Sequence, residues 1–244
     1  MSLVGLFNVA WSDYAPALRD GLIKTLEFTA AGFAGAAVLG LVLALMRLSP
    51  LRLLRLPAAL YTELFKNVPL LAIIFLTYFG LVSVGVRLSV FQAGALSLVV
   101  FYASYLSEIF RSAIAGVHGG QQEAAEALGL SRRVTFAHVV FPQALRQALP
   151  GTNTMLVDLL KSTSLLVTIS AAELMSQGQL IASETFRALE VYAVIAVLYF
   201  AVCYPLSQIL LWFERQVRAG VPLLPRRRRR MRVVRSMLEQ DAVA

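Results

Sequence analysis

The 244-residue sequence has little cysteine and little charge. It contains one cysteine, Cys203, so no disulfide within the chain supports the fold, and cysteine usage says nothing about the redox compartment. Only 15% of the residues are charged. A GxxxxGK[ST] string is missing, which argues against ATP binding by the usual phosphate loop. HExxH and GxSxG strings are also missing, so we expect no catalytic residue and no enzymatic activity.

Two further absences concern metal binding and secretion. His118 and His138 stand twenty residues apart without cysteine or clustered carboxylates, so we expect no metal site. The first twenty residues lack the basic start and the cleavage site of a signal peptide, and their apolar part is too short to cross a bilayer. We interpret residues 1–20 as an uncleaved segment at the membrane interface.

Hydrophobic residues, by contrast, make up 58% of the chain, and its mean hydropathy of +0.71 is typical of an integral membrane protein. A helix needs about 20 apolar residues to cross a bilayer. Four runs of that length carry no charge: Phe28–Met46, Asn67–Val86, Leu88–Ser107 and Val191–Phe213. A fifth, Leu149–Ala172, contains Asp158 and Lys161. The sequence therefore predicts an all-α membrane protein with five transmembrane helices.

Positive charge is spread unevenly over the predicted connections, and cytoplasmic loops retain lysine and arginine. The connections after the first and third spans and the tail after the fifth are basic: Arg47, Arg52, Arg55 and Lys66; Arg111, Arg132, Arg133 and Arg146; Arg215, Arg218 and the run Arg226–Arg235. This predicts an N-terminus outside the cytosol and a cytosolic C-terminus. We divide the chain into a membrane domain, 21–214, which includes a cytosolic loop, 112–148, and a basic tail, 215–244.

The arginine-rich tail has two interpretations. Such a run is typical of a nucleic-acid patch or a localisation signal. A cationic segment directly after a membrane span also fixes topology, because anionic lipid attracts it. We favour the second interpretation and expect contact with the lipid membrane and no nucleic-acid partner.

The loop between the third and fourth spans is polar and helical in pattern. The string "GQQEAAEALG" is rich in helix formers and ends at Gly129, and Ser131 is placed to cap "RRVTFAHVVF", which Pro142 is expected to stop. A partly apolar helix pair that has no soluble domain beside it favours a docking element for another protein. A merely structural loop is the alternative. A DNA-binding helix-turn-helix is disfavoured, because membrane spans tether both sides of the loop.

At these residues the chain resembles a known family. A spaced pattern in this loop resembles the EAA loop of bacterial ABC importer permeases, with Phe141 where leucine is usual. The pattern consists of Glu123-Ala124-Ala125, three further residues, Gly129, nine further residues, Val139, one further residue and Phe141-Pro142. Four more strings resemble the polar amino acid uptake branch of that family: "YTELFKNVPLL", "ASYLSEIFRSAI", "FPQALRQALPGTNT" and "LLKSTSLL".

The resemblance implies a type I ABC importer permease in the bacterial inner membrane, serving polar amino acids or related compounds such as opines. Two permease subunits, identical or related, would pair above a dimer of cytosolic ATPases and below an extracytoplasmic binding protein. The chain itself would bind no cofactor, and its partner would use ATP. Glu123 would lie near the start of the docking helix, where the dipole favours a carboxylate. The small side chains of Ala124 and Ala125 would allow close approach to that face, and Gly129 would allow the chain to turn.

Ionisable groups within a bilayer are candidates for function, because burying them there is costly. Asp158 and Lys161 are three residues apart and can neutralise each other on one helical face. Alternatively, Lys161 lines the substrate pathway or its gate together with Ser162, Thr163 and Ser164. Both interpretations stay open.

Two other features also have paired interpretations. Glu27 is placed to meet a cationic substrate group, or it pairs with Lys24 at the interface. Small residues recur every fourth position in the first span, which suits a subunit interface or packing within the chain: Gly32, Ala36, Gly40 and Ala44.

Two rival functions remain at this point. A secondary transporter driven by an ion gradient usually shows inverted repeats, which five spans do not suggest. The other rival is a membrane scaffold that recruits a cytosolic protein through loop 112–148 without transporting anything.

Overall fold

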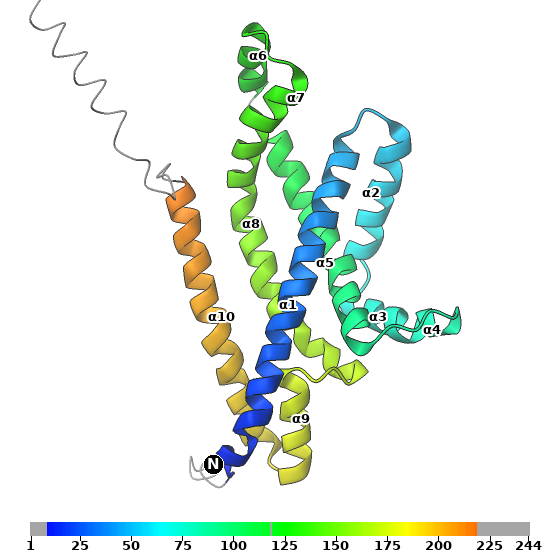
Figure 1. Cartoon of the computed structure of the whole chain (residues 1–244), viewed down its shortest axis with the longest axis vertical. Helices are drawn as coiled ribbons and strands as arrows, with labels where there is room; N and C mark the ends of the chain where they lie inside the picture. Colours follow the sequence, from blue (N-terminus) through cyan, green and yellow to red (C-terminus); the bar gives the residue numbers. More distant parts are fainter. Residues whose placement is uncertain (1–8, 118, 219–244) are drawn as a thin grey trace, which may run out of the picture.

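The computed structural model describes residues 9–117 and 119–218 (Figure 1), and within them it contains helices and no strand. The predicted all-α class is therefore confirmed for the described chain. The elements, with η2 and η3 as π-helices and η4 as a 3₁₀-helix, are α1 (Trp11–Leu48), α2 (Arg52–Lys66), α3 (Leu70–Phe75), η2 (Leu76–Gly80), α4 (Leu81–Ser83), α5 (Val90–Ala115), α6 (Gly119–Ala127), α7 (Arg132–Thr135), η3 (Phe136–Val140), α8 (Phe141–Ser162), η4 (Thr163–Ile169), α9 (Leu174–Thr185) and α10 (Ala188–Arg218).

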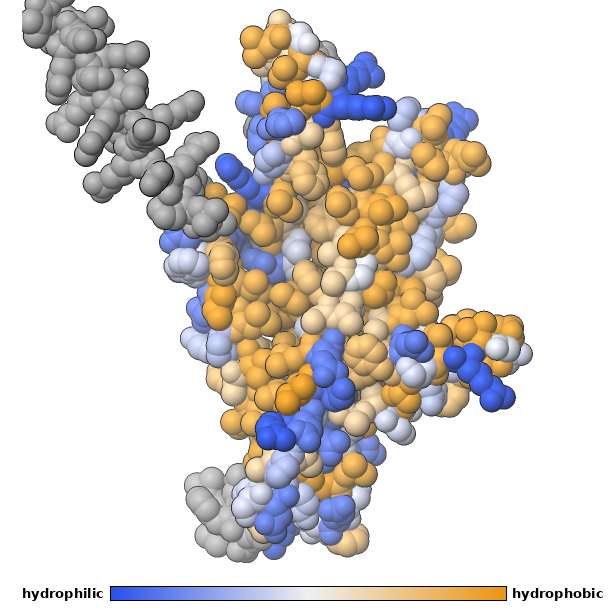
Figure 2. Space-filling model, in the orientation of Figure 1, coloured by the Kyte–Doolittle hydropathy of each residue, from blue (hydrophilic) through white to orange (hydrophobic). Residues whose placement is uncertain are grey.

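Three unbroken helices are long and apolar enough to cross a membrane: Trp11–Leu48, Val90–Ala115 and Ala188–Val217. Two further candidates are bent pairs, Arg52–Lys66 with Leu70–Ser83 at 107° and Arg132–Ile169 with Leu174–Thr185 at 50°. Five spans result only if each bent pair counts once. Figure 2 shows a broad hydrophobic surface over the middle of the molecule, with hydrophilic residues at the end that holds α6 and α7 and at the end where α1 begins.

The second predicted span, Asn67–Val86, contains one continuous helix, but this helix covers only Leu70–Ser83. Pro69 occupies the N-cap of α3, and the segment from α3 to α4 leaves the axis of α2 at 107° (Figure 1). A helix over Leu70–Ser83 is about 21 Å long at 1.5 Å per residue, shorter than the roughly 30 Å of hydrocarbon. The physical reason is Pro69, which lacks the N–H that would continue α2.

The fourth predicted span, Leu149–Ala172, overlaps a helical segment that begins earlier and ends slightly sooner. Its helix, α8, begins at Phe141, and the following 3₁₀ turn stops at Ser170, whose φ is 58°. Pro142 does not stop a helix as expected. It lies just after the π-helix η3, and the chain stays helical from η3 into α8.

The stripe of small residues on α1 packs within the chain. Gly40 lies so close to α5 that an added Cβ would meet Leu106 Cβ at 2.9 Å and the Ala103 carbonyl at 3.2 Å. Ala36 and Ala44 are completely buried. This favours intrachain packing over a subunit interface for the stripe, because its surface is already covered by α5.

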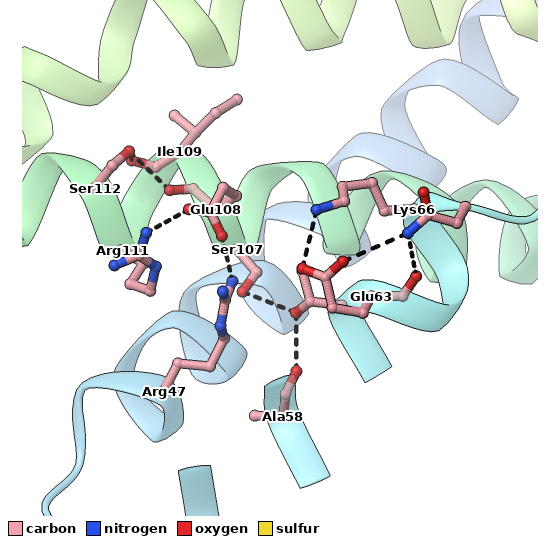
Figure 3. A network of polar contacts seen from close by, with 11 residues as sticks. Arg47, Ala58, Glu63, Lys66, Ser107, Glu108, Ile109, Arg111 and Ser112 are labelled. Atoms are coloured by element: carbon pink, nitrogen blue, oxygen red, sulfur yellow. Dashed lines mark hydrogen bonds and ion pairs between the residues drawn. The ribbon is translucent and has the colours of Figure 1, made fainter. Parts of the chain in front are cut away.

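Polar contacts join α1, α2 and α5 at the end near α6 (Figure 3). Arg47 Nη1 lies 2.6 Å from Glu108 Oε2, and Arg111 donates to the other oxygen of the same carboxylate. The Thr62 hydroxyl on α2 is 3.5 Å from that of Ser107 on α5. One carboxylate thus holds the last turn of α1 against α5.

Glu173 organises the bend between η4 and α9. The residue is fully buried, and each carboxylate oxygen accepts two bonds. Oε1 accepts from the N–H of Ser176 at 2.8 Å and from its hydroxyl at 3.1 Å. Oε2 accepts from the Met175 N–H at 2.8 Å and from the Tyr199 hydroxyl at 2.9 Å. Thr25 of α1 accepts from the N–H of Leu174 at 3.2 Å. The bend is thereby fixed to both α1 and α10.

The two terminal predictions fall partly outside this description. Residues 11–20 form the first turns of α1 and continue into its apolar part, while residues 1–8 lie outside the described chain. Residues 215–218 end α10, and the arginine run 226–235 lies outside the described residues.

Candidate coupling loop and substrate pathway

The loop 112–148 contains a helix that ends in a glycine turn. The helix α6 stops at Ala127, and Gly129 has a φ of +73°. The N–H of Leu130 donates to the carbonyl of Ala125 at 3.1 Å across this turn. Gly129 therefore takes the left-handed conformation expected for it, which costs glycine nothing.

The three residues Glu123, Ala124 and Ala125 do not share one environment. Ala125 is 3% exposed in a helix that contacts α7 and η3, whereas Glu123 and Ala124 are exposed. Leu128 is 80% exposed. Glu123 and Ala124 of α6, together with Leu128 in the turn after it, are thus exposed, and Ala125 packs the helix against its own loop.

The expected place of Glu123 near the helix N-terminus is wrong. The helix begins at Gly119, its first turn contains no acidic residue, and Glu123 lies in its middle. The helix dipole acts mainly within the first turn, so it contributes little to this carboxylate.

The second half of the loop leads directly into α8. Ser131 occupies the N-cap of α7, but within the described chain its side chain makes no capping bond, contrary to expectation. The helix then runs without a break through η3, which includes Val139, to Phe141 and the exposed Pro142. A bond of 3.4 Å from Gln143 Nε2 to Gln121 Oε1 ties α6 to α8.

The start of α8 is packed firmly against α5. Ala144 and Ala148 of α8 are buried with Ala113 of α5. Phe141 borders a small apolar cavity of about 60 Å³ at the same contact. The helix spans Phe141–Ser162, about 33 Å at 1.5 Å per residue, so one continuous helix connects the loop to the polar residues at its far end.

Those polar residues form a cluster around Asp158. Tyr102 of α5 places its hydroxyl 2.8 Å from Asp158 Oδ2 and 2.8 Å from Ser162 Oγ. A phenol has one proton, so it donates to the carboxylate and accepts from the serine. Lys161 Nζ is 3.7 Å from Asp158 Oδ1, which realises the predicted pair. Sequence reasoning missed Tyr102, although a tyrosine in an apolar span needs a partner for its hydroxyl.

Asp158 and Lys161 border a cavity of about 300 Å³ between α8 and α10, here named the α8–α10 cavity. Its polar lining from α8 also includes Asn153 and Thr154, and α10 adds Ser207 and Glu214. The sequence analysis missed the α10 residues, because nothing in a single sequence indicates which helix packs beside α8.

The three hydroxyl residues beside Lys161 have different surroundings in the structure. Ser162 belongs to the Tyr102 cluster. Ser164 donates to the carbonyl of Lys161 at 2.8 Å. Thr163 is fully buried and donates to the carbonyl of Leu160 at 2.7 Å, so it does not line the α8–α10 cavity here.

Glu27 lies in a different cavity, of about 400 Å³, named here the α1–α5 cavity. Lys24 Nζ is 2.7 Å from Glu27 Oε2, so the predicted pairing of these two residues is present. The cavity is lined by Lys24, Glu27 and Phe28 of α1, Val90 and Phe91 of α5, and Ser170 and Ala172 after η4.

Metal ligation finds no support in the described part of the chain, where no three His, Cys, Asp or Glu residues are grouped for it. The ring of His138 faces the Val134 carbonyl at 3.2 Å. His118 lies outside the described residues.

Comparisons with known proteins match this arrangement. Residues 36–219 match the family model described as "Binding-protein-dependent transport system inner membrane component". The probable glutamine ABC transporter permease protein GlnM of Bacillus subtilis is 33% identical over 81% of this chain and 92% of its own length. The glutamine transport system permease protein GlnP of Escherichia coli is 34% identical over 85% and 97%.

The fold also matches a solved structure entitled "Crystal structure of an amino acid ABC transporter with histidines", with a TM-score of 0.80 and 34% identity over 85% of this chain and 97% of that one. A methionine ABC transporter in an inward-facing conformation shares the fold alone, at a TM-score of 0.71 and 21% identity. The chain therefore belongs to the family of inner membrane components of binding-protein-dependent transport systems, as a permease of its amino acid ABC transporter branch.

Proposed function

We propose that this chain forms the membrane pathway of an ATP-driven importer that carries polar amino acids or related compounds into a bacterial cell. The observation that carries the proposal is α8, one helix that begins in the loop resembling the EAA motif and ends at Asp158 and Lys161. Relatives named as glutamine permeases support the amino acid class.

The orientation follows from the basic residues. The loop 112–148 and the C-terminus face the cytosol, and the start of α1 and α9 face outward in the cytoplasmic membrane. Five crossings are counted, with α2 and the α3–α4 segment as one broken crossing and the helix from Arg132 together with α9 as the other. The broken crossings place non-helical backbone where protein or water must satisfy it.

Partners supply what the chain lacks. A dimer of cytosolic ATPases binds and hydrolyses ATP and receives α6 through the surface of Glu123, Ala124 and Leu128. A second permease subunit, identical or related, completes the pathway, and an extracytoplasmic binding protein delivers the substrate. This chain binds no ATP, cofactor or metal of its own.

The mechanism uses α8 as a continuous helical connection. Closure of the ATPases displaces α6, and the Gln121–Gln143 bond and the buried Ala125 pass that displacement to α8. Asp158 and Lys161, at the far end of α8, then shift relative to Glu214 and Ser207 on α10. The charged lining of the α8–α10 cavity suits a substrate that carries both ammonium and carboxylate groups.

The docking role is tested by co-purification of the tagged chain with its partner ATPase. Glu123→Arg should reduce recovery of the ATPase about tenfold, as expected when a charge at an interface is reversed. Glu184→Arg is the matched control, because Glu184 is exposed at the opposite end of the molecule. Unchanged recovery for Glu123→Arg would contradict the docking surface. If the unaltered chain recovers the ATPase but the complex transports no substrate, the result would favour a membrane scaffold instead.

A further inference from the structure

The α1–α5 cavity has the size and chemistry of a binding site. Its volume of about 400 Å³ exceeds that of a small amino acid, and three separate segments of chain line it. In the orientation proposed above, it opens at the outer end of the pathway. The α8–α10 cavity has a separate lining, with no residue in common.

The cavity presents one positive and one negative group side by side. Lys24 Nζ and Glu27 Oε2 are 2.7 Å apart, and their side chains remain 50% and 44% exposed. Pairs this exposed contribute little to folding stability, because water competes for both partners. Each group therefore has open coordination for a second, oppositely charged partner at little cost to the fold.

The walls around this pair are apolar except for Ser170, and they are held by packing and hydrogen bonds. The Phe28 and Phe91 rings lie 4.8 Å apart, and Phe91 keeps 40% of its surface exposed. Ser170 and Ala172 lie in the short segment before Glu173, whose four accepted bonds hold the bend in place. A site built on such fixed elements is ordered before its ligand arrives.

We propose that the α1–α5 cavity is an entry site that recognises the zwitterionic head group shared by α-amino acids. Glu27 accepts from the α-ammonium group, and Lys24 donates to the α-carboxylate, so one ion pair becomes a ring of four alternating charges. Phe91 lies beside the Cα and the start of the side chain. Recognition of the head group alone admits many side chains. This inference rests on the proposed function, because it requires the cavity to face the compartment that supplies the substrate.

The test measures binding of labelled L-glutamine to the permease–ATPase complex in nanodiscs without a binding protein. Lys24→Gln and Glu27→Gln should each weaken binding about tenfold, the loss of one charge-assisted bond. The matched control is Arg19→Gln with Asp20→Asn, a second exposed pair on α1, 3.0 Å apart, that does not line this cavity. Its binding should change less than about twofold.

A second ligand separates recognition from folding. Glutamine lacking its α-carboxylate should bind to the unaltered chain more weakly than glutamine does. Its binding should not weaken further in Lys24→Gln, because this ligand already lacks the group that Lys24 contacts. Equal weakening for both ligands, equal weakening by the Arg19/Asp20 control, or no weakening at all would overturn the site. ATP-dependent uptake by the unaltered complex is measured in parallel. If the entry-site proposal fails, uptake is still present, whereas if the importer proposal fails, uptake itself is absent.

Discussion

At the scale of single residues, Tyr102 and Asp158 show how a polar cluster is maintained in an apolar helix bundle. Tyr102 is 1% exposed, and its hydroxyl is satisfied by Asp158 and Ser162. Asp158 therefore has partners on two sides, the phenol on α5 and the ammonium of Lys161 on its own helix. The cluster holds the carboxylate at the edge of the α8–α10 cavity.

Tyr102→Phe should lower the free energy of unfolding by about 1–2 kcal/mol, because it removes a hydrogen bond to a charged group from a buried position. Unfolding by denaturant in detergent micelles measures the change. Tyr204→Phe is the control, since Tyr204 is 53% exposed. Equal loss in both variants would mean that the Tyr102 hydroxyl has no special role in stability.

At the scale of elements, the contact between α1 and α5 is the central packing of the molecule. The small residues of α1 allow the two helices to approach until side chains of α5 touch the α1 backbone. Arg47 and Glu108 then join the two helices beside the loop 112–148. This fixed pair is the base against which α8 packs through Ala144 and Ala148.

Gly40→Ala should destabilise the protein by about 1–3 kcal/mol, because its methyl group would meet Leu106 and backbone of α5 within 3.2 Å. Thermal unfolding of the purified chain measures this. Gly80→Ala supplies the comparison, since the nearest atoms to its added methyl lie at 3.8 and 3.9 Å on Leu76. A stable Gly40→Ala variant would contradict the close contact.

Much of this element structure could be predicted from the sequence, and the failures have particular causes. Long uncharged runs predicted α1, α5 and α10, because apolar length is a local property. The α3–α4 segment is equally apolar, but its direction depends on Pro69 and on contacts with α5. The turn at Gly129 could be predicted from the residue type. Tyr102, Ser207 and Glu214 could not be assigned to the candidate site, because they reach it through contacts between helices that are distant in sequence.

At the scale of the whole molecule, a hydrophobic middle separates two ends that carry hydrophilic residues. The hydrophobic surface in Figure 2 separates the end that carries α6 and α7 from the end where α1 begins. The single native cysteine makes the proposed orientation directly measurable, because Cys203 alone must be removed before a new thiol is placed.

In a Cys203→Ser chain, Ser183→Cys on α9 should react with a membrane-impermeant maleimide applied outside intact cells. Ser131→Cys, in the loop 112–148, should react only after the membrane is opened. Both serines are exposed, so accessibility within the fold is matched. The reverse labelling pattern would contradict the positive-inside orientation.

The central claim, that an ATPase drives transport through the loop 112–148, is tested most directly by uptake into proteoliposomes. The complex is reconstituted with labelled glutamine and binding protein outside and ATP inside. We predict uptake that requires ATP and falls at least about tenfold in Glu123→Arg, in parallel with the loss of the ATPase. Uptake that follows an imposed proton or sodium gradient and needs no ATPase would contradict the account and identify a secondary transporter.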